Sequence, residues 1–161
     1  MPSRIAQTPR SLCATRIEPS EHSLAFDLGA LHADPIAGNL RAIEAAADPA
    51  NGLVPVVAIP ANRLDLTTGS AGTLRDLVRR GAKAVRLGLG SREWHTGTPE
   101  IGLRSAATRA VLEQVARAGV PLLIPVSNWG DATAAGEGTK DLGIPVVLVD
   151  THYIAIIDHV E

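Results

Sequence analysis

The sequence predicts an α/β fold, either a partial (β/α) barrel or an open parallel sheet with flanking helices. Two short apolar runs, residues 120–124 and 144–149, lack polar alternation, which is typical of strands covered on both faces. Strand-like and helix-like segments alternate along the chain, and this order predicts parallel strands joined by right-handed crossovers. A full barrel needs about 250 residues. Because the chain has 161 residues, a barrel would be partial.

Five strands and three helices are expected. Short aliphatic and β-branched runs predict the strands, and apolar residues on one helical face or a preceding capping residue predict the helices. The strands are expected at residues 23–28, 53–59, 84–87, 120–124 and 144–149, and the helices near residues 38–47, 74–80 and 105–118. Between the last two strands we expect only a short or poorly formed crossover near residues 139–142.

The domain organisation follows from these elements. Residues 1–20 are expected to form an N-terminal tail or an incomplete first helix, and residues 21–161 one partial barrel domain. Residues 154–161 have the character of the first turns of a helix with no strand after it. A sheet that stops there leaves an exposed edge. We therefore expect either a piece of something longer or a homo-oligomer whose copies cover the edges.

The amino-acid composition limits which binding partners and which cellular location we expect for the protein. The net charge of −2 and the aromatic content of 2% indicate neither a basic surface nor a base-stacking platform, so no nucleic acid is expected. The single cysteine, Cys13, excludes an internal disulfide and fits a reducing, cytoplasmic location. No apolar run approaches the roughly 18–20 residues of a spanning helix, so no membrane is expected. The expected partner is a small molecule.

Polar residues follow the apolar runs at the predicted carboxyl ends of two strands. Asn128 follows the fourth strand, and Asp150 and His152 follow the fifth. Parallel strands bring their carboxyl ends to one edge of the sheet, where α/β folds place ligands and catalytic groups. The sequence therefore predicts a site at this edge. Alternatively, Asn128 and its neighbour Trp129 serve only packing at the end of the sheet.

Two further residues have both a structural and a functional interpretation. Arg86 lies within the third predicted strand, where a buried guanidinium without an anion is costly. It either binds a substrate carboxylate or forms a salt bridge inside the fold. Asp34 is expected to cap the helix that follows. The alternative is that Asp34 and Asn39 shape the floor or rim of a pocket.

Four local patterns carry a family resemblance. They are Asp34-Pro-Ile-Ala-Gly-Asn39 after a strand, the apolar run 53–60, the helix-to-strand stretch 77–87, and the paired strands 118–124 and 144–153. In this order, over residues 23–153, the chain resembles strands two to six of the amidohydrolase-related superfamily. That superfamily comprises (β/α)8 metal-dependent hydrolases and decarboxylases.

The resemblance implies a metal-assisted reaction at C–N or C–C bonds of small carbonyl or carboxylate substrates. A divalent metal, zinc or similar, would be bound by His152, and the substrate pocket would contain Arg86, Asn128, Asp150 and Asn39. The first-strand His-x-His pair of the family has no counterpart in residues 1–22, and Pro125 stands where the family has a ligand histidine. We therefore expect an incomplete site with impaired activity. The alternative is a non-catalytic α/β binding or interaction module.

Overall fold

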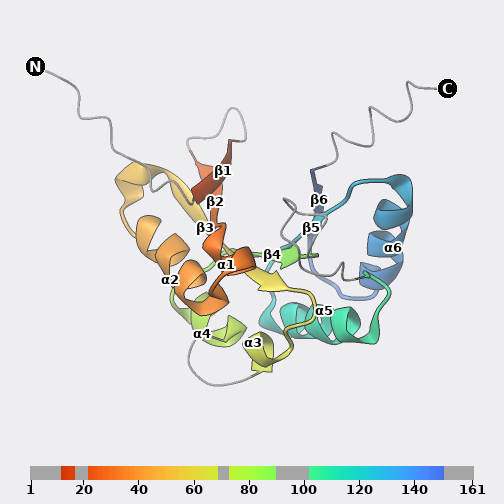
Figure 1. Ribbon diagram of the computed structural model, residues 1–161. Helices are drawn as coiled ribbons and strands as arrows, with labels where there is room; N and C mark the ends of the chain where they lie inside the picture. Colours follow the sequence, from red (N-terminus) through yellow and green to blue (C-terminus); the bar gives the residue numbers. More distant parts are fainter. Residues whose placement is uncertain (1–11, 17–21, 69–72, 90–101, 151–161) are drawn as a thin grey trace, which may run out of the picture.

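The spatial order of the strands follows the order of the chain. The computed structural model describes residues 12–16, 22–68, 73–89 and 102–150 (Figure 1). Within these ranges one sheet contains the strands β1 (Leu12–Arg16), β2 (Ser23–Asp27), β3 (Leu53–Pro60), β4 (Ala84–Gly88), β5 (Leu122–Pro125) and β6 (Val146–Val149). Strands β2 to β6 are parallel, and β1 pairs antiparallel with β2. The α/β class and the open-sheet alternative are therefore confirmed, and the described strands do not close into a barrel.

The helices connect these strands in the expected alternation. They are α1 (Gly29–His32), α2 (Pro35–Ala45), α3 (Asp65–Thr68), α4 (Leu74–Arg79), α5 (Ala106–Ala118) and α6 (Trp129–Thr139), together with a 3-10 turn at Pro49–Asn51. Helix α2 begins earlier than predicted, because Asp34 Oδ1 accepts hydrogen bonds from the amides of Ile36 and Ala37, both at 3.0 Å. The predicted capping role of Asp34 is thus confirmed.

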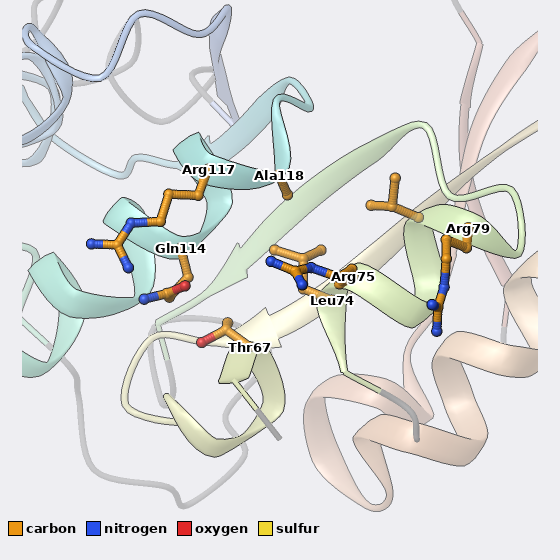
Figure 2. Close-up of a pocket in the computed structure, with 8 residues that line it drawn as sticks. Thr67, Leu74, Arg75, Arg79, Gln114, Arg117 and Ala118 are labelled. Carbon is orange, nitrogen blue, oxygen red and sulfur yellow. The ribbon is translucent and has the colours of Figure 1, made fainter. Parts of the chain in front are cut away.

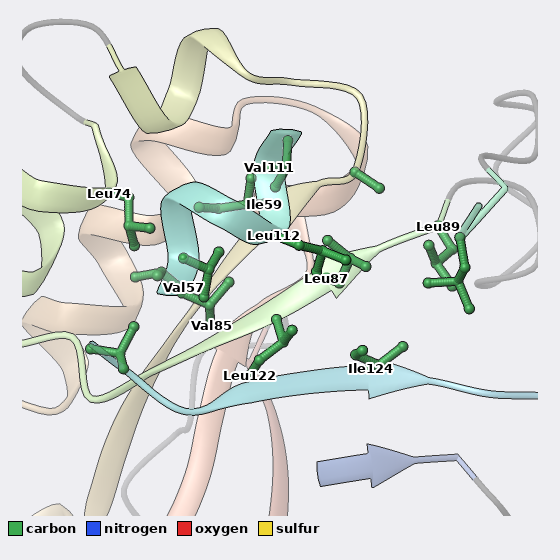
Figure 3. Packing of buried hydrophobic residues seen from close by; sticks show 14 of the residues in the cluster. Val57, Ile59, Leu74, Val85, Leu87, Leu89, Val111, Leu112, Leu122 and Ile124 are labelled. Carbon is green, nitrogen blue, oxygen red and sulfur yellow. The ribbon is translucent and has the colours of Figure 1, made fainter. Parts of the chain in front are cut away.

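Helices α2 to α6 all pack on one face of the sheet. The shared core contains Val57, Ile59, Val85, Leu87, Leu122 and Ile124 from the strands, and Val111, Leu112 and Val115 from α5 (Figure 3). Leu74 and Leu77 of α4 and Ala134 and Ala135 of α6 extend the same core. Right-handed crossovers between strands in sequential order place every connecting helix on the same side. We call this side the helix-covered face.

The other side of the sheet, which we call the open face, has a smaller apolar cluster. Val56, Ala84 and Leu123 are buried there, with Leu24, Phe26 and Val149 packed around them. These residues alternate along the strands with those of the helix-covered face, as the two-residue period of a strand requires. The open face also carries Arg86 in the middle strand of the five parallel ones, β4.

Two sequence-based predictions were wrong. Residues 12–16 form strand β1 where a tail or an incomplete helix was expected. The crossover between β5 and β6 is the 11-residue helix α6, where only a short or poorly formed crossover was expected. Its three glycines lower its helix propensity. Packing of Ala134 and Ala135 against the core outweighs that penalty, because tertiary contacts contribute more to a short helix than propensity does.

The chain's ends lie outside the described residues, including residues 154–161, for which a helix was expected. At the β6 side of the sheet, the side chains of Val147 and Leu148 are 48% and 39% exposed. No helix in the described ranges is long and apolar enough to cross a membrane.

Candidate functional site

Arg86 is the one charged residue of the described part of strand β4, and it is almost fully buried. It is paired in register with Ala58 of β3 and Leu123 of β5, and it is only 4% exposed. The guanidinium carbon lies 5.0 Å from the centroid of the Phe26 ring, within the range of a cation–π contact. A guanidinium at this depth requires compensating anions and dipoles.

Asp150 supplies one such anion. Its Oδ2 accepts a hydrogen bond at 2.9 Å from Nη2 of Arg86, 64 positions earlier in the chain. Asp150 directly follows β6, so the arginine side chain spans β5 to reach it. The burial of the pair is very unequal, because the Asp150 side chain is 44% exposed and that of Arg86 is 5% exposed. The salt bridge foreseen for Arg86 is present, and two of the predicted pocket residues lie together.

The backbone of Asp150 also marks this position. Its φ of 61° is in the left-handed region, which aspartate and asparagine tolerate better than other residues with a side chain. Asp150 directly follows the last residue of β6. This position places the carboxylate above the open face, on the carboxyl side of the strand ends, where parallel sheets bind ligands.

Asn128 occupies a different environment, at the start of α6. Its Oδ1 accepts from the amide of Asp131 at 2.9 Å, and its Nδ2 donates to Asp131 Oδ2 at 3.0 Å. The Ser127 hydroxyl donates to the same carboxylate oxygen at 2.9 Å. This reciprocal arrangement is a helix cap in which an acidic side chain three residues later completes the contacts. The amide of Asn128 is therefore engaged in fixing the turn between β5 and α6.

Asn39, the fourth predicted pocket residue, replaces a missing strand partner. Strand β2 pairs with β3 only as far as Pro55, and beyond that point the amide of Asn39 takes over. It accepts from Ala58 N at 2.8 Å and donates to Ala58 O at 2.9 Å. The preceding residue, Gly38, lets α2 pack closely on α1, since a Cβ there would overlap the backbone of Ala30. Asn39 is 2% exposed, so the structure gives it a supporting role.

A second ion pair, which was not predicted from the sequence, lies at the same edge. Asp27, the last residue of β2, is 1% exposed and accepts from Arg41 Nε at 2.8 Å and from the Gly29 amide at 2.6 Å. Its carboxylate raises the pKa of Arg41, mainly through the hydrogen bond. The available signal was an acidic residue directly after an apolar strand. The same argument had selected Asp150.

The predicted metal ligand, His152, lies outside the described residues. Within the described ranges, no three His, Cys, Asp or Glu side chains are grouped so that they could hold a metal ion. The carboxylates of Asp27 and Asp150 are each bound to an arginine, and that of Asp131 to the cap of α6. The described donor set therefore does not fit a metal centre.

Taken together, the carboxyl edge presents a buried cation held by an accessible carboxylate. Such an arrangement can exchange one carboxylate for another without leaving the guanidinium uncompensated. Asn128 and Asn39 fix the elements around it. No protein-family model, no curated protein and no solved structure matches this chain.

Proposed function

We propose that the protein binds a small carboxylate-bearing molecule at the carboxyl edge of its sheet, through Arg86. The observation that carries the proposal is the unequal burial of the Arg86–Asp150 pair. Asp150 is solvent-accessible and can swing away, whereas Arg86 is fixed in the sheet by its backbone and its contact with Phe26. A ligand carboxylate that displaces Asp150 gains a desolvated, charge-assisted contact, which is stronger than the same contact in water.

We further propose that the sheet belongs to the partial (β/α)-barrel type that the amidohydrolase resemblance implies. Sequential strand order with helices on one side is the arrangement of such barrels, whereas a doubly wound sheet reverses its order and has helices on both sides. The order β2 to β6 and the single helix-covered face support the barrel type. The open face with Arg86 corresponds to the barrel interior.

The reaction implied by the resemblance is hydrolysis of a C–N or C–C bond in a carbonyl or carboxylate substrate. Because the described carboxylates do not form a metal centre, we derive no step that passes through a metal. In this proposal Arg86 orients the substrate by its carboxylate, and Phe26 helps to exclude water from one side of the guanidinium. A non-catalytic binding module is the second candidate, favoured because Asp27, Asp131 and Asp150 are all engaged.

The first test uses Asp150→Asn, because asparagine keeps the left-handed backbone and removes only the charge. Loss of this anion beside buried Arg86 should destabilise the fold by about 1–2 kcal/mol. Acetate at about 100 mM should then raise the melting temperature of the variant more than that of the wild type, since a ligand bound only by the folded state stabilises it. The matched control is Asp141→Asn, an exposed residue two positions after α6.

Equal acetate effects on Asp150→Asn and Asp141→Asn would contradict the proposal. A second variant, Arg86→Met, keeps much of the side-chain volume and should lose the acetate response altogether. Zinc content measured with and without His152→Ala separates the two candidates. Tight zinc binding that depends on His152 favours the hydrolase, and carboxylate binding by a zinc-free protein favours the binding module.

The cytoplasmic location and the self-association that the sequence suggests remain predictions. A cytoplasmic location is supported by the single cysteine. Self-association that covers an exposed edge of the sheet can be measured as a molar mass by light scattering.

A further inference from the structure

A hollow of about 260 Å³ lies among helices α3, α4 and α5, away from the open face of the sheet (Figure 2). Five of the described side chains that line it are polar, and they come from three different helices. They are Thr67 from α3, Arg75 and Arg79 from α4, and Gln114 and Arg117 from α5. Figure 2 shows Arg117 and Gln114 side by side on α5, with Arg75 reaching toward them from α4. We call this site the arginine hollow.

The floor of the arginine hollow is apolar. Leu74, only 1% exposed, is part of the main core, and Val78 and Ala118 pack against that core. Long polar side chains over an apolar base are typical of small-molecule sites, where a few polar groups orient a largely apolar ligand. A ligand with a charged head and a short apolar body would match both parts.

The charge of the arginine hollow is one-sided. Among the described residues, three arginines and no acidic side chain line it, although the whole chain has a net charge of −2. Arg79 is paired with Asp76 at 3.1 Å. Arg75 and Arg117 form no ion pair with any described residue, so two positive charges share the hollow without a protein anion between them. Their repulsion is relieved if an anion binds there.

We propose that the arginine hollow binds a small organic oxyanion, a phosphate or carboxylate group attached to a short apolar body. Arg75 and Arg117 hold the oxyanion from two helices, since guanidinium forks match both groups in geometry. The Gln114 amide donates a further hydrogen bond, whereas the Thr67 hydroxyl donates to the carbonyl of Leu64 at 2.7 Å and forms part of the wall. The apolar body lies on Leu74 and Val78. This site is separate from Arg86, which lies on the other side of the sheet, and the inference does not depend on the carboxylate site there.

The experiment titrates the full chain with inorganic phosphate, phenyl phosphate and benzoate at low salt, followed by calorimetry and by NMR shifts. Phenyl phosphate should bind several-fold more tightly than inorganic phosphate, because its ring buries apolar surface. Comparison with benzoate, measured from the NMR shifts of the residues that line the hollow, tells whether the phosphate or the carboxylate head is preferred there, since benzoate is also expected to bind at Arg86. Arg117→Gln and Arg75→Gln should each weaken phenyl phosphate binding about tenfold or more, as expected for a lost charge-assisted contact.

The matched control is Arg109→Gln. Arg109 lies on α5 like Arg117, is exposed, does not line the hollow and pairs with Glu113 at 3.7 Å. This variant removes the same charge and should change binding by less than about twofold, since distant exposed charges are screened. Arg86→Met should leave phenyl phosphate binding unchanged, which separates this site from the carboxylate site.

Two results would overturn the proposal. One is that none of the three anions shows saturable binding at concentrations up to about 10 mM. A specific site should bind at least one of them with a dissociation constant in the millimolar range or lower. The other is equal weakening by Arg109→Gln and Arg117→Gln, which would mean that only overall charge matters. A cooperative thermal unfolding transition establishes that each variant is folded. If the Arg75 and Arg117 variants weaken binding alike, misfolding of one variant does not explain the loss.

Discussion

The two faces of the sheet differ in what they bury. Among the described residues, the helix-covered face joins twenty buried apolar residues into one cluster, whereas the cluster on the open face has three, and Arg86 lies beside them. Apolar burial is non-directional and adds up over area, so the helix-covered face contributes most of the stability. The open face carries the buried charge and opens at the carboxyl edge. The difference separates a face that stabilises the fold by apolar burial from a face that carries the Arg86–Asp150 ion pair, where we propose that a ligand binds.

The strongest way to break this comparison is to create a cavity on the helix-covered face. Leu122→Ala removes a fully buried side chain from β5 and should lower the free energy of unfolding by about 3 kcal/mol, because transfer and cavity terms add. Denaturant unfolding measures the loss. The control Leu148→Ala is the same substitution at a 39% exposed position on the neighbouring strand, and should cost less than about 1 kcal/mol. Leu148 is paired in register with Ile124 of the same face, so equal losses would mean that burial in this core does not determine the cost.

A smaller effect is expected where α2 meets the sheet through a polar contact. Asn39→Ala leaves the buried amide and carbonyl of Ala58 without the partners that the side chain provides, at a cost of about 2 kcal/mol. Asn51→Ala is the matched control. Asn51 donates one exposed hydrogen bond to Ala45 O, and its loss should cost well under about 1 kcal/mol. Hydrogen exchange at Ala58 would report the same change locally, and unchanged protection there would contradict the assigned role.

The smallest effect belongs to an exposed ion pair, in contrast to Arg86 and Asp150. The Arg63 guanidinium lowers the pKa of Asp65, mainly by its hydrogen bond. Because the folded pKa lies below the unfolded one, the stabilisation is present above the unfolded pKa and is lost as the pH falls through the folded pKa. Asp65→Asn should therefore cost less than about 0.5 kcal/mol at pH 7 and nothing once the carboxylate is protonated. Unfolding of the wild type and of Asp65→Asn measured from pH 2 to pH 7 checks this, and a difference that does not shrink as the pH falls would contradict it.

The elements that could be predicted from sequence have strong local signals. Helix α5 was predicted closely because Ser105 caps it, Gly119 ends it with a φ of 68°, and Val111, Leu112 and Val115 lie on one face. The parallel strands were recognised from unbroken apolar runs. Helix α6 was missed because its buried face is made of alanines, and small residues interrupted by glycines give no apolar period. Strand β1 was missed because its pairing with β2 is a contact between segments.

The residues of the candidate site also differ in how clearly the sequence marks them. The sequence was enough to select Arg86 and Asp150, since a charge within a buried strand and an acid after a strand are both conspicuous. It did not distinguish them from Asn39 and Asn128, whose amides are engaged by Ala58 and Asp131. Asp27 and the arginine hollow were not foreseen. Thr67, Arg75 and Arg117 stand apart in the chain, and only the packing of three helices brings them together.

By itself, the sequence determined the fold class, the parallel strands and the polar residues at their carboxyl ends, because strand period, capping and turn chemistry act over a few neighbouring residues. Which charges meet, which amide replaces a strand partner, and where Arg75 and Arg117 come together without an anion among the described residues follow only from how the segments pack. Those outcomes depend on contacts between residues up to 64 positions apart, such as Arg86 with Asp150. Burial, which makes these contacts strong, exists only once the chain has folded.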